Sequence, residues 1–144
     1  MKKVLLVIII ALIFSCEGDE DRGPDCSAVL CPADKFYLTY RNTAGDTLIG
    51  TTYVQDSFKL ASQSDVIYIK PVPGTEGTLS IFYYKLETDL DYALELNETE
   101  TDTLNFSFLS VYSDCCTDSS MLELTYNNTP TPADSEDSYV LIKE

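Results

Sequence analysis

Apolar and polar residues alternate with a period of two through most of the chain after Lys35. In the first such segment, residues 35–41, Phe36, Leu38 and Tyr40 fall on one side. Successive side chains of a β-strand point to opposite faces, so this alternation predicts a strand with one buried face. By the same criterion the sequence has further candidate strands at residues 48–54, 57–61, 66–70, 78–85, 92–96, 103–112, 121–127 and 139–143.

Turn-forming residues separate these segments. Residues 42–46 (NTAGD) are predicted to close a hairpin, and Pro71 ends a later strand because proline cannot donate to a ladder. Residues 129–137 contain Pro130 and Pro132 and are predicted to be a connector. With no helical periodicity, the pattern predicts an all-β fold: an antiparallel β-sandwich of about 7–8 strands, Ig-like or transthyretin-like in architecture.

The first 15 residues have a different pattern. Lys2 and Lys3 precede an uninterrupted apolar run at residues 4–14. As a helix this run would rise about 16 Å, roughly half of a hydrocarbon core of about 30 Å. A charged start followed by a short apolar core predicts a signal peptide and not a stable membrane span.

The end of this segment, Ile13-Phe14-Ser15-Cys16, resembles the lipobox of bacterial lipoproteins. The resemblance implies lipidation of Cys16, including palmitate-type acylation, and cleavage directly before it. Several acyl chains on one residue give stable anchoring that one chain cannot. The alternative is a plain secretory signal with an unrelated cysteine. The predicted organisation is therefore a signal peptide at 1–15, a lipidated tether at 16–25 and one disulfide-stapled domain at 26–144.

Four of the five residues at 17–21 (EGDED) are acidic, which predicts a solvated spacer. Their position after Cys16 also resembles the acidic export signal of surface lipoproteins of the Bacteroidota type, a group of small proteins of unknown function. This resemblance implies an outer-membrane protein anchored by lipid at the cell surface. The periplasmic leaflet is the alternative location.

Composition excludes several classes of function. The chain has a formal charge of −15, and loss of residues 1–15 would leave seven basic residues against 24 acidic ones. Such acidity opposes nucleic-acid binding, which depends on basic groups that neutralise phosphates. The absence of histidine removes the commonest general base and the usual zinc ligand. We therefore predict no enzyme activity, no cofactor and no metal site.

Four cysteines remain after Cys16: Cys26, Cys31, Cys115 and Cys116. An even number in an exported chain predicts two disulfides. A bridge between the adjacent Cys115 and Cys116 would distort the intervening peptide, so both predicted bridges join the entry segment to the later pair. Two connectivities remain open. A four-thiolate metal site is disfavoured because adjacent cysteines suit tetrahedral ligation poorly.

Two short motifs resemble the Asp-(Ser/Thr)-aliphatic O-glycosylation sequon of Bacteroidota-type exported proteins: Asp46-Thr47-Leu48 and Asp102-Thr103-Leu104. They imply possible modification at Thr47 and Thr103, although chance explains such short motifs equally well. Glu98, Glu100 and Asp102 are together predicted to form a polar hairpin tip.

Tyrosine is abundant, with ten residues, and most of them lie in predicted strands. They are expected to pack in the core, while a minority on an exposed face would suit a ligand platform. The sequence therefore predicts a non-catalytic, lipid-anchored envelope protein that binds an unknown protein or glycan. The alternative is a structural envelope lipoprotein with no small-molecule ligand.

Overall fold

The computed structural model describes residues 25–144, which form an all-β structure, as the alternation predicts. This part of the chain has no α-helix and two 3₁₀ helices, η1 (Cys26–Ala28) and η2 (Tyr83–Lys85). The ten strands are β1 (Lys35–Asn42), β2 (Phe58–Ala61), β3 (Val66–Pro71), β4 (Thr78–Phe82), β5 (Asp91–Glu95), β6 (Thr101–Ser113), β7 (Cys116–Tyr126), β8 (Thr129–Thr131), β9 (Ala133–Ser135) and β10 (Ser138–Lys143).

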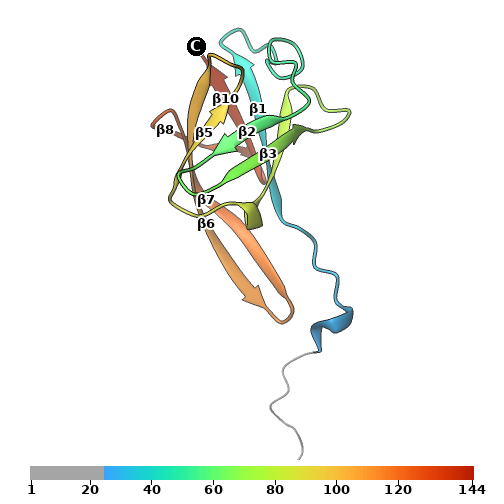
Figure 1. Cartoon of the computed structure of the whole chain (residues 1–144). Helices are drawn as coiled ribbons and strands as arrows, with labels where there is room; N and C mark the ends of the chain where they lie inside the picture. The colour runs from blue at the N-terminus through green and yellow to red at the C-terminus, as the bar shows by residue number, and fades with distance from the viewer. Residues whose placement is uncertain (1–24) are drawn as a thin grey trace, which may run out of the picture.

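All ten strands belong to one mixed sheet, in the order β8-β7-β6-β5-β2-β3-β4-β1-β10-β9. Strand β3 takes part in both halves, because residues 66–69 pair with β2 while Lys70 and Pro71 pair with β4. The sheet turns at β3, and its halves lie on opposite sides of one core (Figure 1). The rings of Phe36 in β1 and Phe106 in β6 meet across this core, with centroids 5.3 Å apart.

Two features of the predicted sheet are wrong. The pairing is not purely antiparallel, because β10 runs parallel to β1. The structure also has ten strands, since the predicted connector at 129–137 contains the short strands β8 and β9. Parallel neighbours require the chain to cross from one edge of a sheet to another. That crossing depends on contacts distant in sequence, so local alternation does not reveal it.

The predicted strand at residues 48–54 is also wrong. Only one isolated bridge occurs there, between Ile49 and Tyr53. The N–H groups of Thr52 and Tyr53 both donate to the Leu48 carbonyl at 2.9 Å, and Gly50 has a φ of +87°. This local turn overrides the strand propensity of the β-branched and aromatic residues.

The sheet does not close into a barrel, although its two edge strands are consecutive in the chain. Strands β8 and β9 stand at opposite ends of the sheet and are joined through Pro132. Pro130, inside β8, and Pro132 both lack the N–H that a ladder needs. A seam therefore remains between the two edges.

The core follows the alternation of the sequence. Phe36, Leu38 and Tyr40 are all fully buried, as are Leu104 and Phe106 in β6. Burial of each of these Phe and Leu side chains contributes about 1.5–3 kcal/mol relative to exposure. The side chains that lie between them face outward or are only half-buried, so the period of two directly produces one apolar face per strand.

The distal part of the β6–β7 hairpin leaves the core. We call residues 109–120 the arm; most of its side chains are exposed, in contrast to the first half of β6. The arm extends from one end of the molecule, next to the segment that contains η1, and the C-terminus lies at the other end (Figure 1).

Candidate functional site

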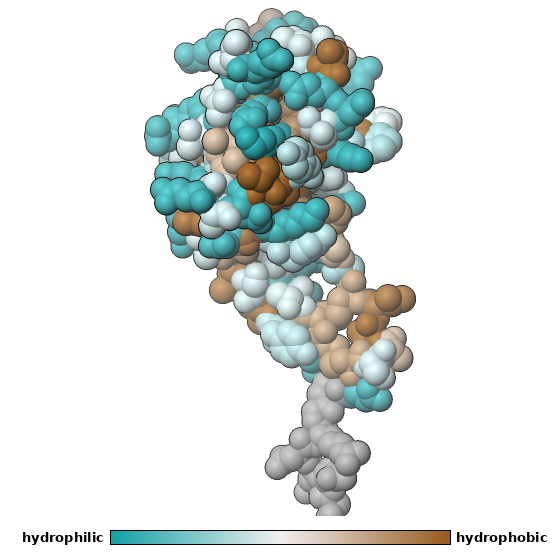
Figure 2. Space-filling model, viewed as in Figure 1, coloured by the Kyte–Doolittle hydropathy of each residue, from teal (hydrophilic) through white to brown (hydrophobic). Residues whose placement is uncertain are grey.

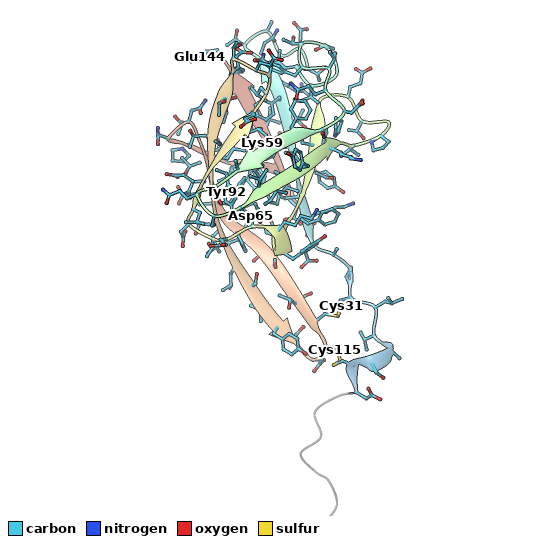
Figure 3. All side chains as sticks on the ribbon, viewed as in Figure 1. Cys31, Lys59, Asp65, Tyr92, Cys115 and Glu144 are labelled. Atoms are coloured by element: carbon cyan, nitrogen blue, oxygen red, sulfur yellow. A yellow bond between two sulfur atoms is a disulfide. The ribbon has the colours of Figure 1, made fainter. Side chains whose placement is uncertain are left out.

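Two disulfides join the N-terminal segment to the tip of the arm. Cys26 is bonded to Cys115, with Cα atoms 5.2 Å apart, and Cys31 is bonded to Cys116, with Cα atoms 5.4 Å apart. The prediction of two bridges between these pairs is confirmed, and the connectivity that the sequence left open is now assigned. We call these four cysteines the clamp; Cys31 and Cys115 are labelled in Figure 3.

Local structure positions both sides of the clamp. On the arm, Asp114 adopts a φ of +49° in the tight turn that joins β6 to β7, and the adjacent cysteines follow it. On the other side, η1 begins after Asp25, whose carboxylate accepts a hydrogen bond from the Ser27 N–H at 3.0 Å. This backbone hydrogen bond lowers the pKa of Asp25, since it favours the charged carboxylate.

Beyond the clamp, the chain is tied to both the arm and the body of the protein. The Ser119 N–H donates to the Asp34 carboxylate at 2.7 Å, and the Tyr83 N–H donates to the Asp34 carbonyl at 3.2 Å. Residues 31–34 therefore lie against the β7 side of the arm and against η2. A tether pulled from the N-terminus would act on the arm through the clamp before it could reach β1.

A hollow of about 330 Å³ lies where the N-terminal segment, the arm and η2 meet. Its lining residues include Tyr84, which is 71% exposed, and the hydroxyl-bearing Ser110, Thr117 and Ser119. An exposed aromatic ring beside hydroxyl groups offers an apolar surface together with hydrogen-bonding groups. Such a combination suits recognition of a polar ligand with an apolar face.

The tyrosines of the predicted strands divide into two groups. Tyr53, Tyr83 and Tyr92 are buried in the core, whereas the most exposed ones are Tyr68, Tyr84 and Tyr112. These three belong to β3, η2 and β6 respectively, so they do not share one strand face. Of the three, only Tyr84 lines the hollow.

A second hollow, of about 570 Å³, follows the seam of the sheet and is lined partly by Asn127 and Lys143. Next to it, Asp102 is only 3% exposed and binds Lys143 Nζ at 2.8 Å. It also accepts hydrogen bonds from the Tyr126 hydroxyl at 3.0 Å and from the Asn127 amide at 3.2 Å. Each of these polar groups has a hydrogen-bond partner within the cluster, and the cluster joins β6 to β7 and to β10.

The interpretation of Asp102 as part of a polar hairpin tip is therefore wrong. Its position already carried a signal, because Asp102 occupies the same inward register as Leu104 and Phe106. A carboxylate at an inward strand position needs a buried partner. Close by, the buried Tyr40 hydroxyl has no hydrogen-bond partner among residues 25–144, and burial first, then the charge of Asp102, raises the pKa of Tyr40.

The two candidate glycosylation residues lie in different environments. Thr103 is exposed on β6, opposite Ala93 of β5. Thr47 is half-buried at a bridge to Arg41, with its side chain close to Gly77. Thr103 is thus the more accessible hydroxyl, and modification of either residue stays a prediction.

Other predictions concern residues that the structure does not describe. Cys16, the signal peptide and nearly all of the acidic tether lie outside residues 25–144. Within that range, no helix is long and apolar enough to span a membrane. The same residues contain no cluster of three or more acidic or cysteine side chains arranged to hold a metal ion.

Comparison with known proteins adds no relative. No protein-family model matches the chain, and neither a curated protein nor a solved structure is significantly similar to it.

Proposed function

We propose that this chain is a non-catalytic, lipid-anchored protein of the bacterial cell envelope. In this proposal Cys16 carries the lipid, residues 17–25 form the tether, and residues 26–144 form one β-sandwich domain of Ig-like or transthyretin-like architecture. The facing halves of the sheet support the sandwich description. The outer membrane, with the domain at the cell surface, is the proposed location.

One observation carries the mechanical part of this proposal. Both disulfides bind the N-terminal segment to the arm within a few residues of the proposed tether. Without the bridges, force on a tether would act directly on the start of β1, an inner strand that pairs with β4 and β10. With the clamp, the force enters the arm at its tip and is divided between β6 and β7, so it reaches the body of the protein through both strands and not through β1 alone.

The domain is further proposed to recognise a protein or glycan of the envelope at the hollow beside the clamp. The exposed Tyr84 ring and the surrounding hydroxyl groups support this assignment. Aromatic rings stack on the apolar faces of sugars and of peptide side chains, and hydroxyl groups then fix their orientation.

Anchoring is tested with Cys16→Ala in the full chain. The native chain should be recovered with the outer-membrane fraction and be removed by protease from intact cells. The variant should no longer be lipidated and should leave the membrane fraction. A variant that still fractionates with membranes, or a native chain that carries no lipid by intact-mass measurement, would overturn the anchor.

Recognition is tested by capture from envelope extracts of the native host. Tyr84→Ala should lose the captured component, because it removes the ring beside the hollow. Tyr68→Ala is the matched control, since Tyr68 is similarly exposed but lies on β3. Equal capture by both variants would exclude the hollow. No capture by the native domain would favour a structural envelope protein without a ligand.

A further inference from the structure

The outer edge of β6 changes its surroundings along the strand. Strand β5 pairs with β6 at residues 101–105. The loop before β5 continues this cover, because the Asp89 N–H donates to the Phe106 carbonyl at 2.8 Å and the Phe108 N–H donates to Thr88 Oγ1 at 3.1 Å. From residue 109 to residue 113, no described residue pairs with this edge.

The direction of the uncovered backbone groups follows from the register. In an antiparallel ladder, alternate residues bond to the neighbour on one side and then to the neighbour on the other. Phe106 and Phe108 bond away from β7, so Ser110 and Tyr112 direct their N–H and C=O groups the same way. Two donors and two acceptors are therefore free for another strand.

The opposite edge of the arm is different. On β7, the Ser119 N–H is already bonded to Asp34, and β8 pairs with Leu124 through Tyr126. The N-terminal segment and β8 thus occupy much of that side. The β6 side is the edge of the arm that remains open to a partner.

This open edge lacks the usual protection against pairing. Natural edge strands carry charged residues, prolines or bulges that discourage contact with other strands. Residues 103–113 contain no charged residue and no proline, and the one register shift of the β6–β7 ladder places its extra residue, Leu122, on β7. Leu109 and Val111 are each 52% exposed, and Leu122 on β7 is 68% exposed. In Figure 2, the apolar residues of the narrow end lie mainly on the side of the N-terminal segment, and the residues beside them are mostly of intermediate hydropathy.

We propose that the β6 edge at residues 109–113 is a strand-pairing site for a second copy of this chain. An antiparallel pair centred on Val111 places Ser110 opposite Tyr112 of the partner subunit, and Tyr112 opposite Ser110 of the partner subunit. Each of these two pairs exchanges two hydrogen bonds, so four form in total. The edge is complementary to itself, which gives a closed two-fold dimer.

Charge selects this edge for self-association. The chain carries a formal charge of −15, so most approaches of two copies are repulsive. The uncharged stretch is where two copies approach without placing carboxylates in contact. The nearest acids are Asp114 in the turn and Asp118, which lies opposite Val111 on β7. Added salt should therefore strengthen the dimer by screening their repulsion.

The clamp prepares this edge for pairing. The disulfides hold Cys115 in the turn and Cys116 directly after it, so the arm does not have to be ordered when the second copy binds. The dimer uses the backbone of Ser110, a residue that also lines the hollow, but it needs neither the lipid on Cys16 nor a ligand in the hollow, so its failure would leave the proposed function intact.

Cysteine cross-linking tests the register. In the proposed pair, Val111 faces Val111 of the partner subunit at a narrow, non-hydrogen-bonded position with Cα atoms about 4.5 Å apart, within the range of a disulfide. Val111→Cys in the full chain should give a disulfide-linked dimer upon mild oxidation. Leu109→Cys, on the same face, should not, because its two copies would be about 13 Å apart along the strands. Equal cross-linking of both variants, or of neither, would overturn the proposal.

Proline substitution tests the hydrogen bonds. Tyr112→Pro removes an outward N–H without removing a β6–β7 hydrogen bond, and Thr117→Pro does the same at the residue directly opposite on β7. By sedimentation, the native chain and Thr117→Pro should have the mass of a dimer, and Tyr112→Pro that of a monomer. A dimeric Tyr112→Pro, or a native chain that stays monomeric in high salt, would contradict the pairing. Peptide mapping of both native disulfides checks that each variant is folded.

Discussion

Removing one or both disulfides should give strongly non-additive losses of stability. A bridge stabilises the fold mainly by shortening the unfolded chain, and the effect grows with the loop that it closes. The Cys26–Cys115 bridge spans a sequence separation of 89 residues. For a loop of this length the chain-entropy relation gives about 4.5 kcal/mol at 25 °C.

The second bridge contributes much less once the first is present. With Cys26 and Cys115 already joined, the bridge from Cys31 to Cys116 closes a ring of only eight residues, worth about 2–2.5 kcal/mol by the same relation. Replacing Cys31 and Cys116 by serine should therefore cost about 2–2.5 kcal/mol. Replacing all four cysteines should cost about 6–7 kcal/mol, a large part of the stability of a small domain.

Urea denaturation followed by tyrosine fluorescence measures these losses. The native chain, the variant without Cys31–Cys116 and the variant without Cys26–Cys115 are compared with the variant that lacks both bridges. The two single-bridge variants should have similar midpoints, because the remaining bridge still closes a loop of more than 80 residues. The m-value should rise when the last bridge is lost, since the unfolded state then expands.

Two results would refute this reasoning. If one bridge costs as much as both together, the bridges act as a single unit in the folded clamp and not through loop length. If each single removal costs about 4–5 kcal/mol and the losses add, the unfolded chain does not share the constraint. Either outcome would move the origin of the stabilisation from the unfolded state to the folded arm.

Three further predictions concern the body of the protein. Asp102→Ala should lower the free energy of unfolding by about 3–5 kcal/mol, because it leaves the partly buried Lys143 without its carboxylate partner. In the same urea assay, Lys59→Met should lower it by less than about 1 kcal/mol, because the side chains of Lys59 and its partner Glu95 are 37% and 42% exposed. Gly77→Ala should be more destabilising in thermal unfolding than Gly74→Ala, because only at Gly77 would the new Cβ lie 2.8 Å from a threonine side chain; equal losses would show that the positive φ alone decides. Burial first, and then the carboxylate of Glu100, raises the pKa of Tyr53 from 10.0 to about 12. Because the folded state favours the neutral phenol, the contribution of Tyr53 to stability should be complete below pH 10 and should disappear as the pH rises toward 12. Spectrophotometric titration of the phenols together with unfolding of Tyr53→Phe measures this effect, and an unchanged pH dependence in the variant would contradict it.

The period-two pattern of the sequence by itself determines much of the fold. Strand alternation identifies the inward positions of β1 and β6 because a pleated strand must separate its two faces. The pairing of an early cysteine pair with a late one is also predictable, since adjacent Cys115 and Cys116 do not bridge each other easily. The inward register of Asp102 is visible in the sequence as well, although its partner is not.

Only the tertiary structure decided the remaining features. The parallel pairing of β1 with β10 depends on strands almost 100 residues apart in the sequence, so no local signal specifies it. Residues 48–53 form a turn and not a strand because the N–H groups of Thr52 and Tyr53 donate to the Leu48 carbonyl. The pairing of Cys26 with Cys115, and not with Cys116, depends on how the N-terminal segment lies along the β7 side of the arm. The open β6 edge exists because the cover from β5 and its preceding loop ends before Ser110. Local patterns set which residues face inward, whereas long-range contacts decide which edges and cysteines meet.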